Sequence, residues 1–127
     1  MTNERRRFTR YRVKENVFAA LNEPEVIVGQ IKDLSLGAAA FEFIPETGEN
    51  AALHGQYFLD IFTLGSSEKL LSFPCRVRFR KSSREVSRVF YPTVLSHVCV
   101  AEFRDLPNDQ SRALLDFLMR YSVGYAA

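Results

Sequence analysis

The sequence is poor in the residues on which most enzyme classes depend. Its 127 residues include two His, two Cys and no Trp. His54 and His97 are solitary, with no Cys or carboxylate at metal-ligand spacing, and no nucleophile elbow or phosphate-binding glycine loop occurs. We therefore expect no catalytic residue, no metal site and no cofactor, and a protein that is not an enzyme.

Long hydrophobic runs are also missing. No apolar run approaches the ~20 residues of a membrane helix, and the N-terminus has no apolar core of the kind that a signal peptide needs. Cys75 and Cys99 each lie in an apolar, strand-like run, which favours two buried thiols in a reducing compartment over a disulfide. These features predict a cytoplasmic protein without membrane insertion.

Aromatic residues are plentiful and indicate strands. Eleven Phe and five Tyr suit a pleated surface, and short runs with a period of two alternate with turn residues. The expected strands are 13–21, 26–34, 39–44, 57–64, 70–80, 86–95 and 97–103. The expected turns are 22–24, 33–38, 45–55, 65–67 and 81–85. The pattern predicts a mainly β, antiparallel barrel of six or seven strands in one domain, residues 13–127.

The C-terminal part has a different period. Asn108 or Asp109 is a suitable N-cap, and Gly124 is a natural terminator. Apolar residues between them recur at helical spacing: Leu114, Phe117, Leu118 and Tyr121. We expect one amphipathic helix over about 108–123, lying across the sheet.

Residues 1–12 form a polar arm that we expect to be flexible. The arm concentrates basic side chains in a chain whose net charge is only +2: Arg5, Arg6, Arg7, Arg10 and Arg12. A guanidinium can bind a phosphate bidentately, bond the O6 and N7 edge of guanine, or stack on a purine. Taken alone, such an arm is more often a solvated basic tail.

A second polar segment lies between two apolar runs, at Asp33-Leu-Ser-Leu-Gly-Ala38. The carboxylate of Asp33 can accept hydrogen bonds from guanine N1 and N2, and the Ser35 hydroxyl can bond a phosphate oxygen. In a strand the two side chains would share one face. The alternative is that both are ordinary turn residues that bond their own backbone.

Together the two segments resemble the PilZ domain family, whose hallmarks are Arg-x-x-x-Arg and Asp/Asn-x-Ser-x-x-Gly. Arg6 to Arg10 match the first motif and Asp33 to Ala38 the second, with Ala38 in place of the last glycine. The resemblance implies a split β-barrel with a C-terminal helix that acts as a receptor for cyclic di-GMP. It implies ligand contacts from Arg6, Arg10, Asp33 and Ser35, a turn held by Gly37 and Ala38, and additional contacts from Arg5 and Arg7.

The substitution at position 38 bears on affinity. If that position needs a positive φ, alanine costs about 1 kcal/mol, or about five-fold in affinity. If glycine is needed so that the ligand can approach the backbone, the methyl group costs more. We expect weakened rather than lost binding.

For signal transduction we expect the ligand to order the arm on the barrel and so change the surface that an unidentified protein effector meets. The protein would act as a monomer or homodimer. The alternative is a degenerate PilZ-like interaction module that binds no nucleotide. A weaker third alternative is a nucleic-acid binder that uses the arm and a second basic stripe, although such stripes are more often solvated strand faces. That stripe is Arg76, Arg78 and Arg80.

Overall fold

A computed structural model describes residues 8–22, 26–43, 55–88 and 91–126, with the backbone alone for 78–88 and 91–96. In these residues the chain forms strands and one helix in the order β1 (Tyr11–Val13), β2 (Val17–Asn22), β3 (Ile27–Leu34), β4 (Ala38–Phe43), β5 (Gly55–Thr63), β6 (Lys69–Arg88), β7 (Tyr91–Phe103), α1 (Asn108–Tyr121) and β8 (Ser122–Tyr125).

The sheet closes on itself through β2. This strand pairs antiparallel with β3 on one side and with β5 on the other, so that Ala19 is opposite both Gly29 and Ile61. The order β2-β5-β6-β7-β4-β3 therefore forms a closed six-stranded barrel, and β1 and β8 extend it from β3. The mainly β antiparallel barrel with a C-terminal helix is confirmed.

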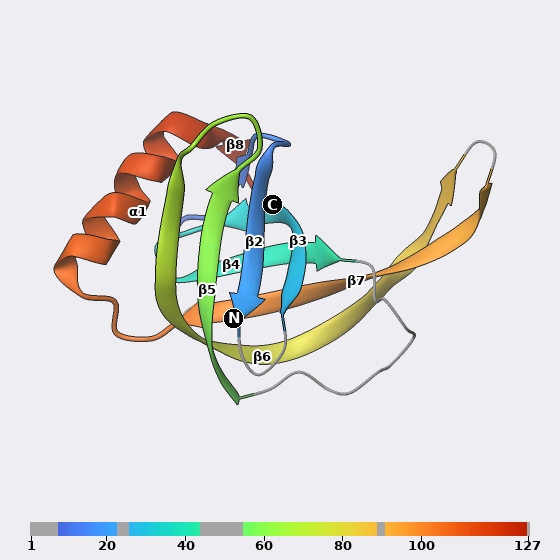
Figure 1. The fold of residues 1–127 in the computed structure, drawn as a ribbon, viewed down its shortest axis with the longest axis horizontal. Helices are drawn as coiled ribbons and strands as arrows, with labels where there is room; N and C mark the ends of the chain where they lie inside the picture. Colours follow the sequence, from blue (N-terminus) through green and yellow to red (C-terminus); the bar gives the residue numbers. More distant parts are fainter. Residues whose placement is uncertain (1–7, 23–25, 44–54, 89–90, 127) are drawn as a thin grey trace, which may run out of the picture.

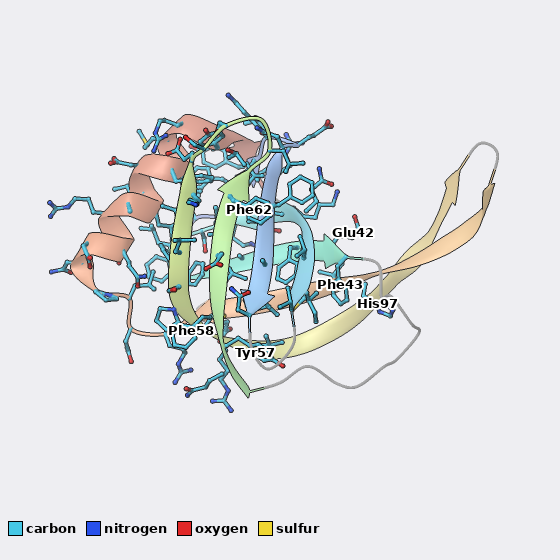
Figure 2. All side chains as sticks on the ribbon, viewed as in Figure 1. Glu42, Phe43, Tyr57, Phe58, Phe62 and His97 are labelled. Atoms are coloured by element: carbon cyan, nitrogen blue, oxygen red, sulfur yellow. The ribbon has the colours of Figure 1, made fainter. Side chains whose placement is uncertain are left out.

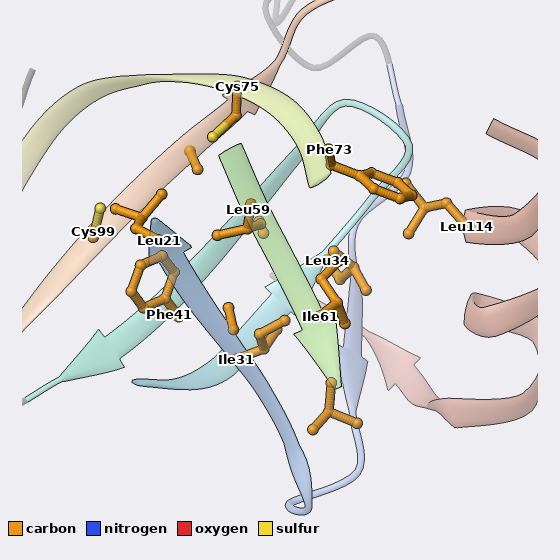
Figure 3. Packing of buried hydrophobic residues seen from close by; sticks show 14 of the residues in the cluster. Leu21, Ile31, Leu34, Phe41, Leu59, Ile61, Phe73, Cys75, Cys99 and Leu114 are labelled. Atoms are coloured by element: carbon orange, nitrogen blue, oxygen red, sulfur yellow. The ribbon is translucent and has the colours of Figure 1, made fainter. Parts of the chain in front are cut away.

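Alternating side chains fill the barrel. Along β4 the odd positions Ala39, Phe41 and Phe43 are buried, and the even positions between them are half-buried. The alternation predicted for this segment and for β3 is confirmed. Figure 3 shows how the inward side chains of opposite strands meet in one apolar core, which includes Leu21, Ile31, Leu34, Phe41, Leu59, Ile61 and Phe73.

Gly29 permits a close approach between β3 and β4. A Cβ at this position would collide with the carbonyl oxygen of Glu42 and come within 2.8 Å of the Phe41 ring. Backbone and a core aromatic ring cannot move aside cheaply, so any larger residue at position 29 would open the barrel wall.

Helix α1 lies along one side of the barrel (Figure 1). Its inner face buries Leu114, Phe117 and Leu118 against the core. At its end Arg120 forms an ion pair with Glu68 of the β5–β6 hairpin. Tyr121 donates a hydrogen bond to the same carboxylate at 3.0 Å. The hydrogen bond from Arg120 holds the pKa of Glu68 below its usual range.

The helix starts at residue 108 as predicted, but the predicted N-cap and the predicted C-terminal end are wrong. The N-cap is Pro107, which makes no side-chain cap hydrogen bond; Asn108 is already helical, and Asp109 lies in the first turn. The helix ends at Tyr121 because Ser122 takes up extended backbone angles and enters β8, which pairs with β1. In the described part of the chain no helix is long and apolar enough to span a membrane.

The turn predicted at 81–85 is also wrong. Strand β6 continues to Arg88. Beyond the stretch of β7 that also pairs with β4, residues 85–88 pair with residues 91–95 of β7 as a two-stranded ribbon that projects from the barrel on the side away from α1 (Figure 1). The predicted turn at 65–67 is confirmed, since β5 ends at Thr63 and β6 starts at Lys69. The turns predicted at 22–24 and 45–55 lie almost wholly outside the described residues.

The outer face of β2 and β5 carries aromatic side chains. Phe18 and Phe62 are cross-strand partners whose rings stack with centroids 6.0 Å apart. Phe58, on the same face of β5, is exposed (Figure 2). Between these aromatic residues Asn22 donates a hydrogen bond to Asp60 at 2.9 Å. The outer face of β2 and β5 is therefore partly apolar.

Cys75 and Cys99 are reduced thiols inside the barrel, on β6 and β7 (Figure 3). Burial raises the pKa of Cys75 to about 12, because a thiolate would be desolvated there. The expectation of two buried thiols is confirmed. Neither can act as a nucleophile while the barrel is closed, since the thiolate is the reactive form.

We therefore expect both thiols to resist labelling. A disulfide reagent added at about pH 8, just below the ordinary thiol pKa, should leave the folded protein unmodified and titrate two thiols after unfolding in guanidinium chloride. Ser67→Cys, which introduces a thiol at an exposed position of the β5–β6 hairpin, should react at once in the folded protein. Rapid labelling of two native thiols would contradict the core described here.

Candidate functional site

The β3–β4 turn is held by the side chain of Ser35. Its hydroxyl oxygen accepts hydrogen bonds from the backbone N–H of Gly37 at 3.0 Å and of Ala38 at 3.1 Å. The backbone N–H of Ser35 donates to the Ala38 carbonyl at 2.9 Å. Ser35 is only 3% exposed. Serine bonds its own turn in this way because its short side chain reaches the N–H groups two and three residues ahead.

A neighbouring strand fixes the same turn from the other side. The N–H of Phe103, the last residue of β7, donates to the Gly37 carbonyl at 2.9 Å. Ala38 opens β4 and pairs with Glu102 of β7. Because the N–H and C=O groups of Gly37 and Ala38 are hydrogen-bonded, the turn is a rigid platform.

Strand β1 brings the arm to this platform. Tyr11 pairs antiparallel with Leu34, the residue between Asp33 and Ser35. Because the pairing is antiparallel, Arg10 and Ser35 lie toward the same end of the β1–β3 pair. The two sequence motifs therefore meet in space through adjacent strands.

The arm continues across the turn and touches it. The ring of Phe8 lies against Gly37, where a Cβ built on the glycine would be 2.6 Å from ring atom Cδ2. Phe8 is still 43% exposed, so one part of the ring packs on the turn and the remainder faces solvent. Phe8 lies within the first motif, and its ring contacts Gly37 of the second motif.

The C-terminal strand holds the base of the arm from the opposite side. Strand β8 pairs with β1, and the rings of Tyr11 and Tyr125 approach with centroids 5.5 Å apart. The N–H of Ala126 donates to the Arg10 carbonyl at 2.9 Å. Arg10 is therefore anchored through its backbone on one side while β1 is tied to β3 on the other.

The structure places five of the predicted site residues. Arg10 and Asp33 are half-buried, and Asp33 follows an irregularity in the β3–β4 register. Gly37 and Ala38 are half-buried in the turn and at the start of β4. Ser35 lies in the turn rather than in the strand, so it does not continue the face of Asp33 as the simple alternation predicts. The remaining three, Arg5, Arg6 and Arg7, lie outside the described residues.

Ala38 is not in a strained conformation. Among the described residues, the non-glycine positions with positive φ are Ser72 and Asp105. Ala38 therefore has ordinary strand angles, and the conformational cost considered for this substitution does not arise. A cost from the methyl group itself would depend on how closely a ligand approaches.

In the described part of the chain, no three His, Cys, Asp or Glu side chains are grouped closely enough to hold a metal ion. The candidate residues in the described part are Arg10, just before β1, Asp33 near the end of β3, and the turn that follows β3. A guanidinium group can bind anions, and a carboxylate can accept hydrogen bonds from bases.

The family model described as PilZ domain matches residues 4–120, almost the whole chain. The chain belongs to the PilZ domain family. No curated protein matches this PilZ chain significantly in sequence. The matched range includes both motifs and the six strands of the barrel.

Solved PilZ structures have the same fold at low sequence identity. The PilZ domain of YcgR from Escherichia coli, described as solved with c-di-GMP, is 15% identical, with a TM-score of 0.72 over 92% of this chain and 91% of that chain. The K. pneumonia MrkH–c-di-GMP complex is 15% identical, with a TM-score of 0.63 over 93% and 52%. The Bacillus subtilis inhibitor of motility is 17% identical, with a TM-score of 0.57 over 93% and 51%. This chain thus spans about half the length of the latter two.

Sequence reasoning missed Phe8, Tyr11 and Tyr125. Phe8 carried a usable signal, because a large apolar residue in an otherwise polar arm has to pack somewhere. Tyr125 carried none, since Ser122–Tyr125 follows the helix directly and its pairing with β1 is set by the tertiary structure.

The role of Ser35 in the turn is testable by unfolding in urea. Ser35→Ala should destabilise the protein by about 1–3 kcal/mol, because two backbone N–H groups lose their acceptor in a buried place. Ser67→Ala, at an exposed position of another turn, should change the free energy of unfolding by no more than about 0.5 kcal/mol. Equal midpoints for the two variants would show that the hydroxyl does not hold the turn.

Proposed function

We propose that this PilZ domain is a cyclic di-GMP receptor in which the arginine arm and the β3–β4 turn bind the ligand between them. The single observation that carries the proposal is the contact of Phe8 with Gly37, because it puts the arm motif directly on the second motif. Structural neighbours whose descriptions include c-di-GMP support it. No catalytic step is part of the proposal.

The ligand carries two phosphates and two guanines, and the site offers a partner for each. Arg10, with Arg5, Arg6 and Arg7 of the arm, supplies guanidinium groups that bind phosphate oxygens or the O6 and N7 edge of guanine. Asp33 supplies a carboxylate that accepts from guanine N1 and N2. The positively charged guanidinium groups and the negatively charged carboxylate would then bind different groups of the same ligand molecule.

Ser35 can form a hydrogen bond to the ligand and still accept the two hydrogen bonds that hold the turn. Its oxygen already accepts from two backbone N–H groups, but its O–H points to the Ala38 carbonyl at 3.4 Å, which is long for such a bond. The hydroxyl hydrogen is therefore the part that could turn toward a phosphate oxygen. Because Ala38 is unstrained, we now expect less loss of affinity than a positive φ would cause.

For the output we propose that ligand binding orders the arm N-terminal to Phe8 and alters the surface presented to a protein effector. Residues 8–10 already lie on the barrel, so the change would concern the arginines before them. Amide hydrogen exchange at residues 4–12 with and without saturating cyclic di-GMP measures this. Unchanged exchange would remove the ordering step from the proposal.

Isothermal titration with cyclic di-GMP tests the receptor function. We expect saturable binding that Arg10→Ala weakens about ten- to hundredfold, since a hydrogen bond to a charged group contributes about 1.5–3 kcal/mol. Arg112→Ala removes an exposed arginine from α1 and should bind like the wild type.

Two outcomes would contradict the proposal. No heat and no thermal stabilisation at high ligand concentration would favour the degenerate interaction module, whose arm and Asp33 could be altered without consequence. Tight binding to random DNA or RNA that weakens steeply with salt would favour the nucleic-acid reading instead.

A further inference from the structure

The contact between Phe8 and Gly37 explains why a glycine occupies position 37. The three heavy atoms nearest to a Cβ built there all belong to the Phe8 ring, at 2.6, 3.0 and 3.6 Å. Gly37 does not have a positive φ, so its backbone angles do not demand glycine. What excludes a side chain at this position is the ring that lies on it.

The turn cannot move away from the ring. Gly37 donates its N–H to Ser35 and accepts from Phe103, so both of its backbone groups are fixed. If position 37 acquired a side chain, Phe8 rather than the turn would be displaced. The Phe8 ring can therefore pack on the turn only if position 37 has no side chain.

Phe8 occupies a special place in the arm. It stands midway between Arg6 and Arg10, and it is the large apolar residue in a stretch of charged and polar ones. Downstream of it the backbone is held by β8 and β3 through Arg10 and Tyr11. Phe8 is thus the N-terminal anchor of the described arm, beyond the strand that fixes its base.

We propose that Phe8 is a positioning residue that docks the arginine arm on the β3–β4 turn before any ligand is present. This inference rests on the proposed function and adds to it a residue at a position that the first motif leaves unspecified. Docking fixes the backbone of residues 8–10 in advance, so the ligand does not bear the entropic cost of ordering them. The apparent affinity follows the fraction of molecules whose arm is already docked.

Phe8→Ala should weaken binding of cyclic di-GMP about tenfold, which corresponds to about 1.4 kcal/mol. Gly37→Ala should weaken it to a similar extent, because the new methyl group expels the ring. The variant that carries both changes should be no weaker than Phe8→Ala, since the Phe8 ring supplies the three nearest heavy atoms and any other atom is at least 3.6 Å from the new methyl group. Phe8→Tyr keeps the ring on the turn and should bind like the wild type.

This double-mutant cycle separates docking from a general structural effect, because only residues in contact give non-additive losses. Isothermal titration of the four proteins supplies the affinities, and in thermal unfolding the three variants should share one midpoint, at or slightly below that of the wild type. Additive losses would overturn the inference. So would tighter binding by Phe8→Ala, which would mean that the ring occupies the place of the ligand.

A second readout needs no ligand. Amide exchange of residues 8–12 in the unliganded protein should be faster in Phe8→Ala and in Gly37→Ala than in the wild type, and faster by the same amount in the double variant. If the wild type binds no cyclic di-GMP, the proposed function fails, and with it the effect on affinity. Exchange rates that are equal in all four proteins would overturn docking itself, whatever the titration gives.

Discussion

The hydrogen bonds around Ser35 and Gly37 are the constraint on which the rest of the site depends. They leave a turn that cannot shift, because its N–H groups are held by the Ser35 hydroxyl and its carbonyl by Phe103. A fixed turn next to the β1–β3 pair gives the arm a surface on which to pack. In the proposed complex it would keep Ser35 in place before the ligand binds. The site therefore combines a rigid turn of the barrel with the arm residues Phe8 to Arg10 that pack beside it.

The ends of the chain cooperate in this arrangement. Strand β1 lies between β3, which carries Asp33, and β8, which follows the helix. The helix is itself tied to the barrel by buried Leu114 and Phe117 and by the ion pair of Arg120 with Glu68. Packing of α1 thus sets where β8 begins, and β8 sets where the arm leaves the barrel.

The barrel and the helix could be predicted from the sequence because burial imposes a pattern on it. Phe41 and Phe43 alternate on β4, and Leu114, Phe117 and Leu118 recur on α1. The polar composition of residues 81–85 predicts a turn, but the backbone continues as strand because it pairs with β7. Pairing of β8 with β1 and packing of Phe8 on Gly37 join residues far apart in the chain, and local patterns do not contain such contacts. Both motifs were found, but not the aromatic residue that links them.

The central claim is that the arm and the β3–β4 turn form one ligand site. An NMR titration of the uniformly ¹⁵N-labelled protein with cyclic di-GMP tests it most directly. The account predicts saturable shifts for the amides of Gly37 and Ala38 and for Phe8 to Arg10, with the amides of Ala20 and Phe62 on β2 and β5 unchanged. Shifts confined to the arm, shifts confined to the turn, or shifts in neither segment would contradict it.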